Sequence, residues 1–170
     1  MMPVLEALRQ SAARKQRAVR LHAAIVARAR EPAFFKDLDV PDTLDGRLDL
    51  LLLHAWLALD RLKGIPHLAQ PLTDILFLGF DEGLRELGAG DVGMGRRMKK
   101  IGDAYFGRMQ AYEGAADEEM LASAIERNIY RGQNGRKPQA RILARYALTA
   151  KAALAQCDPL EGSFDFGPIP

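Results

Sequence analysis

Helical periodicity constrains the fold of this 170-residue chain more than any other feature. Apolar residues recur every three or four positions along nearly all of it, and no segment alternates apolar and polar residues as a half-buried strand does. The length is sufficient for one domain with a proper hydrophobic core. We therefore predict an all-α, single-domain bundle of about six helices with no sheet.

Glycine, proline and acidic residues mark the expected helix ends. Two aspartates, Asp42 and Asp91, stand where an N-cap is expected. Asp117, Glu118 and Glu119 open a further helix, where the positive end of the helix dipole favours acids. A short helical or irregular connector is expected at 32–41. The predicted helices cover about 3–30, 42–63, 67–87, 91–113, a segment opening at Asp117, and 138–156. We divide the chain into a basic amphipathic helix (1–30) that packs on or extends the domain, a helical domain (31–156) and an irregular tail (157–170), whose two phenylalanines and one isoleucine are able to dock as an arm.

The longest apolar run, LLLLHAWLAL, covers Leu50 to Leu59 and is bracketed by Asp49 and Asp60. It is far shorter than the ~20 residues that a membrane span requires. We therefore expect a buried helix here. His54 lies inside this run, so a hydrogen-bonded core or interface histidine is favoured over a metal ligand.

The segment GAGDVGMGRRMKK, from Gly88 to Lys100, has the glycines of a phosphate-binding loop. Such a loop must follow a strand and open a helix, but a helical period precedes this one and no Gly-Lys-Ser/Thr follows. The pattern instead predicts a helix with an apolar stripe at Met94, Met98, Ile101, Tyr105, Met109 and Tyr112. Arg96, Lys99, Lys100 and Asp103 lie on its opposite side. Glycines inside this helix at 93, 95, 102 and 107 indicate either a tight internal packing seam or an interaction surface.

Catalytic and metal-binding patterns are weak. The three histidines have no metal-site spacing, the single Cys157 has no local histidine to activate it, and no serine lies in a Gly-x-Ser-x-Gly turn. Asp42, Asp45 and Asp49 cluster where capping and the helix dipole favour acids. We expect no enzymatic activity, no cofactor and no metal.

Basic charge is concentrated at the N-terminus, where residues 1–30 hold seven basic side chains and one acidic one. One face of this segment carries Leu5, Leu8, Ala12, Val19 and Val26, as in helices that lie at a membrane interface. The same features suit a helix that packs on the domain. An alternative function is therefore a helical adaptor that binds nucleic acid or an anionic membrane surface through this helix and the Arg96–Lys100 patch.

Several motifs occur in a specific order: VPDTLDGR before the apolar helix, then LRELGAGDVGMGRRMKK, YFGRMQAYE and RNIYRG. From about Ala24 to Gly132 the chain resembles the ubiquinol–cytochrome c chaperone family. The resemblance implies a non-enzymatic helical chaperone that binds newly synthesised cytochrome b and supports assembly of ubiquinol–cytochrome c reductase, respiratory complex III. It also implies the ribosome or a small accessory protein as a further partner and allows peripheral membrane contact, with no specific nucleic acid.

The resemblance also points to residues for a partner-binding face. These are Asp45, Arg47, His54, Gly88, Gly90, Asp91, Gly93, Arg96, Arg97, Lys99, Lys100, Tyr105, Arg108, Tyr112, Asn128 and Tyr130. The alternative for each is that it only stabilises the bundle, by capping, pairing or core packing. No long presequence precedes the first helix, so we expect a bacterial cytoplasmic protein, peripheral at the inner membrane, rather than one of the mitochondrial matrix.

Overall fold

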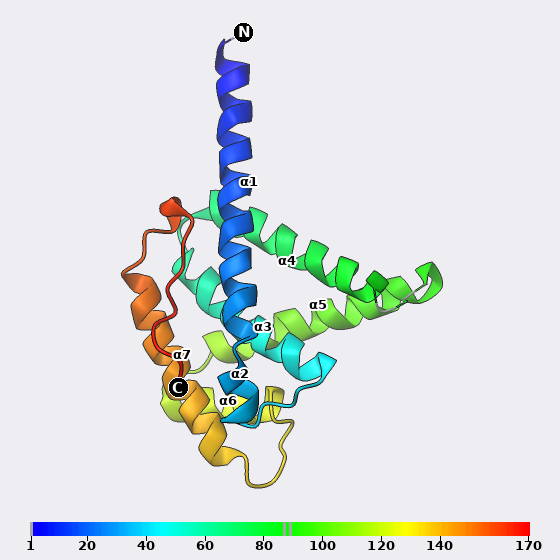
Figure 1. The fold of residues 1–170 in the computed structure, drawn as a ribbon, viewed down its shortest axis with the longest axis vertical. Helices are drawn as coiled ribbons and strands as arrows, with labels where there is room; N and C mark the ends of the chain where they lie inside the picture. The colour runs from blue at the N-terminus through cyan, green and yellow to red at the C-terminus, as the bar shows by residue number, and fades with distance from the viewer. Residues whose placement is uncertain (1, 87, 89) are drawn as a thin grey trace.

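The computed structural model describes residues 2–86, 88 and 90–170, and within them every regular element is helical (Figure 1). This confirms the predicted all-α class, and the short connector adds a seventh helix. The helices are α1 (Met2–Ala29), α2 (Pro32–Lys36), α3 (Leu44–Arg61), α4 (Pro66–Glu86), α5 (Asp91–Glu113), α6 (Glu118–Asn128) and α7 (Lys137–Ala155), followed by the 3-10 turn η1 (Pro159–Glu161).

Helix α3 forms the centre of the bundle and packs against α1, α5 and α7. Every residue from Leu52 to Ala58 is buried, which confirms the prediction of a buried helix. None of the described helices is long and apolar enough to cross a membrane.

Two parts of the fold extend away from this centre. Helices α4 and α5 form an antiparallel hairpin whose turn, near Gly88 and Gly90, points away from the bundle (Figure 1). The N-terminal half of α1 projects in another direction as a single rod (Figure 1). Both parts therefore present long helical surfaces that the core does not use.

The C-terminal tail folds back onto the bundle. Phe166 is buried, Phe164 is partly buried, and Ile169 is 37% exposed. The Phe166 ring lies 5.4 Å from the His54 ring, and the Arg28 guanidinium donates a 2.8 Å hydrogen bond to the Gly167 carbonyl. One phenylalanine thus anchors the tail between α1 and α3.

Both predicted N-caps are wrong by one residue. Helix α6 opens at the acidic cluster as expected, and Asp117 is its cap, since its carboxylate accepts a 2.8 Å hydrogen bond from the Met120 amide. At α3 the cap is Thr43 and not Asp42, because the Asp42 carboxylate pairs with Arg47 while the Thr43 hydroxyl accepts the Gly46 amide. At α5 the cap is Gly90, which makes Asp91 the first helical residue.

Candidate partner-binding surface

The VPDTLDGR motif builds the entry into α3. Thr43 caps the helix, and the Asp42 carboxylate accepts a 2.7 Å hydrogen bond from the Arg47 side chain. Position 46 must be glycine, because a Cβ there would lie 1.9 Å from the Pro41 carbonyl oxygen. Asp45 and Arg47 have side chains that are 72% and 62% exposed. The motif is therefore primarily a folding device with two exposed charges at its edge.

A buried ion-pair network joins α3 to α5 and to the end of α6. The Asp49 carboxylate is 1% exposed and accepts from the Arg108 guanidinium at 2.6 Å and the Arg131 guanidinium at 3.0 Å. Arg131 also lies 3.5 Å from the Asp45 carboxylate. Arg108 Nε and the Tyr112 hydroxyl are buried without a hydrogen-bond partner among the described residues. The network therefore leaves two buried polar atoms without a partner among the described residues.

Burial dominates the electrostatics of this network. Loss of water raises the pKa of Asp49 from 3.8 to about 6, although Arg108 and Arg131 pull it down. Arg131 is half-exposed and shared with a second carboxylate, so it compensates only partly. The same burial, together with the nearby Asp49 charge, raises the pKa of Tyr112.

The RNIYRG motif places the Arg131 guanidinium. The buried Tyr130 donates a 2.8 Å hydrogen bond to the Leu38 carbonyl, which fixes the end of α6 on the loop before α3. Arg131 then adopts a positive φ of 53°, and Gly132 one of 67°. Within α6, the Asn128 side chain donates to the Ala124 carbonyl at 2.9 Å.

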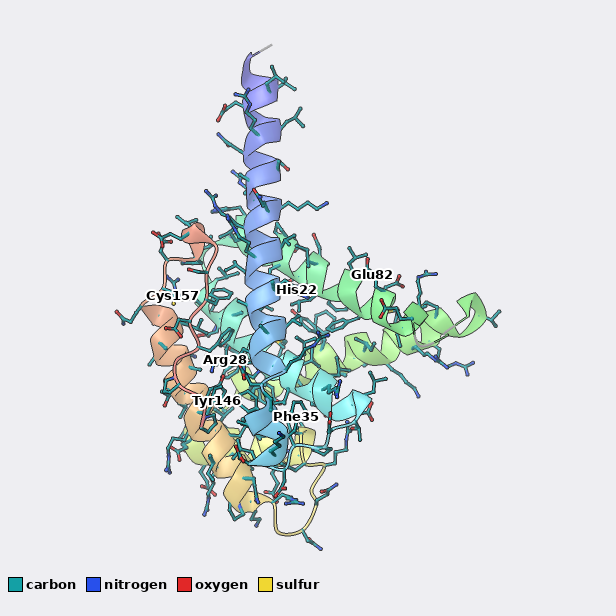
Figure 2. All side chains as sticks on the ribbon, viewed as in Figure 1. His22, Arg28, Phe35, Glu82, Tyr146 and Cys157 are labelled. Atoms are coloured by element: carbon teal, nitrogen blue, oxygen red, sulfur yellow. The ribbon has the colours of Figure 1, made fainter. Side chains whose placement is uncertain are left out.

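His54 forms the polar centre of the core. Its Nδ1–H donates to the Leu50 carbonyl at 2.8 Å, so its Nε2 accepts from the Tyr146 hydroxyl, also at 2.8 Å. Complete burial lowers the pKa of His54 to about 4, so the ring is neutral at physiological pH. Figure 2 shows Arg28 and Tyr146 near each other, beside the tail that covers this cluster.

Five of the residues expected on a binding face point into the protein instead. His54, Tyr105, Tyr112 and Tyr130 are at most 6% exposed, and the Arg108 side chain is 13% exposed and directed at Asp49. We correct the exposed-face expectation for these five residues. The three tyrosines and the histidine fill the core, and Arg108 neutralises a buried acid. The side chain of Asp91 lies outside the described part of the structure.

The outer face of α5 keeps the surface character that the sequence indicated. The apolar stripe from Met94 to Tyr112 is buried or partly buried, as predicted. Opposite it, at spacings of three and four, lie the residues that we call the outer face of α5: Gly93, Arg96, Lys100, Asp103 and Gly107. All five are exposed, and neither Arg96 nor Lys100 makes an ion pair with a described residue.

The glycines of α5 decide between the two explanations given for them. A Cβ built at Gly93, Gly95, Gly102 or Gly107 meets nothing within 4 Å among the described residues. A packing seam inside the bundle is therefore wrong, and the space over these glycines is open. Each glycine in a helix interior costs about 1 kcal/mol relative to alanine. No contact that a side chain would obstruct within the described part of the fold explains why these positions are glycine.

Apolar side chains beside the outer face were not singled out from the sequence. Val92 is fully exposed and Phe106 is 67% exposed, both next to the face along α5, while Leu78 is 56% exposed on α4. Val92 and Phe106 lie outside the Met94–Tyr112 stripe by helical position, and this was the signal that the sequence offered. Arg97 and Lys99 are also exposed; Lys99 pairs with Asp103 at 2.9 Å.

Two other kinds of site, a metal centre and a ligand pocket, have little support among the described residues. Among the described residues, no group of three or more His, Cys, Asp or Glu side chains is placed to hold a metal ion. A depression of about 240 Å³ lies between Trp56, Glu113 and Lys151. Its polar groups satisfy one another, since Trp56 donates to Glu113 at 3.3 Å and the Lys151 ammonium lies 5.5 Å from the indole ring centre. It is smaller than typical ligand pockets.

Comparison with known proteins identifies the family to which this helical fold belongs. The model of the ubiquinol-cytochrome C chaperone family matches residues 36–161. The chain belongs to this family. It is also similar to the crystal structure of the Cbp3 homolog from Brucella abortus, with 36% sequence identity, coverage of 99% of this chain and 97% of that one, and a TM-score of 0.86. No curated protein matches the sequence.

Membership identifies the chain as a chaperone of the complex III assembly class and confirms the resemblance seen in the sequence. The chaperone motifs divide into two structural groups. VPDTLDGR, RNIYRG and the inward-facing part of YFGRMQAYE hold the bundle together through Gly46, Tyr130 and Arg108. The glycines and bases of GAGDVGMGRRMKK remain on the surface. The α4–α5 hairpin is therefore the candidate surface for the client.

Proposed function

We propose that this chaperone binds newly synthesised cytochrome b on the outer face of α5 and holds it for complex III assembly, without catalysing a reaction. The observation that carries the proposal is that this face combines open glycines with bases that make no ion pair with a described residue. These residues have no folding role that the contacts explain. A partner is the remaining reason for them.

The chemistry of the outer face suits a helix of a membrane-protein client. Gly93 and Gly107 lie two turns on either side of Lys100, so a client backbone can approach α5 closely along this line. Phe106 and Val92 offer apolar contact beside it. Arg96 and Lys100 suit the carbonyl oxygens and the negative dipole end at a helix C-terminus, or an acidic side chain.

Location and further partners follow from the client. We place the activity on the cytoplasmic side of a bacterial inner membrane, where cytochrome b leaves the ribosome. The ribosome or a small accessory protein is the second partner that we expect. Exposed Asp45 and Arg47, at the start of α3, offer a separate polar contact for such a partner.

Site-specific photo-crosslinking in cells tests the proposal. One probe replaces Arg96 and another replaces Asp103, both on the outer face; the matched control replaces Ala152, which is exposed on α7. Captured products are identified by mass spectrometry.

The proposal expects cytochrome b as the main product at positions 96 and 103 and little of it at 152. Equal capture at all three positions would mean non-specific contact and would remove the outer face from the account. Ribosomal RNA without cytochrome b at 96 would instead favour an adaptor that binds nucleic acid through the Arg96–Lys100 patch. That adaptor should also lose binding steeply between low and moderate salt.

A further inference from the structure

The projecting half of α1 has no packing partner in the fold. The first buried side chain of this helix is Ala18; of the described side chains before it, all are exposed except Ala13 and Arg17, which are half-buried. Figure 1 shows this half as a rod beyond the rest of the bundle. An isolated helix of about 15 residues is only marginally stable in water, so a surface that covers it would stabilise it.

An apolar stripe on α1 faces away from the protein. Leu5, Leu8 and Val19 are 56%, 62% and 49% exposed, and Ala12 lies between them on the same face. At 100° per residue, this stripe lies about 125° around the helix from the line of Ala18, Leu21, Ile25 and Ala29, which pack into the core. Val26, further along the same face, is half-buried where α1 enters the bundle. From Leu5 to Val19 the stripe is about 21 Å long. The bundle therefore does not obstruct a flat surface that approaches the stripe.

Basic side chains flank the stripe on both sides. By helical position, Lys15 lies at one edge and Arg9 at the other, and both are exposed. Between residues 4 and 20 there are five basic side chains and one acidic side chain, Glu6. An apolar line between two basic edges matches the interfacial layer of a bilayer, with acyl chains below and anionic headgroups beside the helix.

The basic charge and the exposed apolar surface of α1 together favour an anionic membrane over two other partners, a second copy of the chain and RNA. A second copy of the chain would bring the same five bases against one another, which opposes pairing of two α1 rods. RNA would satisfy the bases but would leave Leu5 and Leu8 exposed to water. An anionic lipid surface satisfies both features at once.

We propose that the N-terminal half of α1 lies in the surface of an anionic membrane, with Leu5, Leu8, Ala12 and Val19 inserted between headgroups that Arg9 and Lys15 contact. This surface is separate from the outer face of α5. It would hold the chaperone where a membrane-protein client is inserted. The proposal goes beyond client binding and does not depend on it.

Vesicle co-sedimentation of the purified full chain, without any client, tests the proposal. One set of vesicles contains phosphatidylcholine with ~30% phosphatidylglycerol, which gives the negative surface potential of an anionic membrane. The other set contains phosphatidylcholine alone. The informative variant is Leu8→Asp. Its matched control is Ala7→Asp, which makes the same charge change one residue away on an exposed position outside the stripe.

We expect binding to anionic vesicles, and we expect Leu8→Asp to lower the partition coefficient at least tenfold while Ala7→Asp changes it only a few-fold. Arg9→Glu should lower it by about fivefold or more, since each base near an anionic surface contributes about that factor. Circular dichroism should show both aspartate variants folded, because positions 7 and 8 are exposed.

Three results would overturn the proposal: no vesicle binding by the unaltered chain, equal losses for Leu8→Asp and Ala7→Asp, or a Leu8→Asp defect that appears instead in self-association by light scattering. Binding to a single-stranded RNA that Arg9→Glu abolishes and Leu8→Asp leaves unchanged, without vesicle binding, would assign the helix to nucleic acid. Crosslinking from α5 to cytochrome b is measured separately, so either claim can fail alone.

Discussion

Replacing Asp49 by asparagine tests whether burial or ion pairing governs the network between α3 and α5. Asp49→Asn keeps the size and shape of the side chain and removes its ability to ionise. The carboxyl is 1% exposed, and burial raises its pKa from 3.8 to about 6 despite two guanidinium partners. The variant therefore isolates the part of the folding free energy that depends on the charge of this one group.

The sign and size follow from proton linkage. Below pH 3.8 the carboxyl is protonated in both the folded and the unfolded chain. Between pH 3.8 and about 6 the folded chain retains the proton and the unfolded chain loses it, so the free energy of unfolding falls as pH rises. Above that window the loss is complete. At about 1.4 kcal/mol for each pKa unit, it amounts to about 3 kcal/mol.

Urea unfolding of both proteins at pH 4 and pH 7 measures this loss, followed by fluorescence of Trp56, the single tryptophan, which is 5% exposed. The stability of Asp49→Asn relative to the unaltered chain should rise by about 2 kcal/mol from pH 4 to pH 7, because the unfolded carboxyl is already more than half ionised at pH 4. Any fixed cost of the exchange is the same at both pH values and cancels.

A relative stability that does not change with pH, or that falls as pH rises, would refute this reasoning; the second result would mean that Arg108 and Arg131 hold the pKa of Asp49 below its ordinary value. Asp42→Asn is the control. Its exposed carboxylate pairs with Arg47, which lowers its pKa, so its removal should change relative stability in the opposite direction and weakly.

Four further substitutions have defined outcomes. Gly46→Ala should destabilise the bundle by about 3 kcal/mol or more in urea unfolding, because the new Cβ would meet the Pro41 carbonyl oxygen; a stable variant would show that the α3 entry is not rigid. Phe166→Ala should cost about 3 kcal/mol and expose the tail to proteolysis, and an unchanged melting temperature would contradict its role as the anchor. Gly107→Ala and Gly102→Ala should each raise stability by up to about 1 kcal/mol, since open space surrounds both. Only Gly107→Ala should reduce crosslinking to the client, and equal effects would argue against the outer face.

Much of the fold was predictable because helical periodicity reports burial directly. The stripe from Met94 to Tyr112 faces the core, and the apolar run around Trp56 is buried, as the spacing required. Caps were less predictable. Asp42 and Thr43 are both good capping residues, and what separates them is that Arg47, one turn into the helix, takes the carboxylate.

The candidate site was only partly predictable, because tertiary contacts decide which polar residues turn inward. Arg108 and Lys100 are both basic residues of α5, but only Arg108 has a buried acid, Asp49, in reach from α3. The motif residues Tyr130 and Arg131 likewise contact segments that are distant in the sequence, the loop at Leu38 and Asp49 of α3. Motif membership alone cannot separate folding residues from surface residues, whereas exposure and partners can.

Capture of cytochrome b by a charge-reversed outer face tests the central claim most directly. The variant combines Arg96→Glu with Lys100→Glu, and the matched control combines Arg127→Glu with Lys137→Glu, two exposed bases on α6 and α7. Both proteins should fold, since all four side chains are exposed. Affinity purification from cells should recover cytochrome b with the control and lose most of it with the outer-face variant. Equal recovery with two folded variants would contradict the account and would place the client elsewhere on the chaperone.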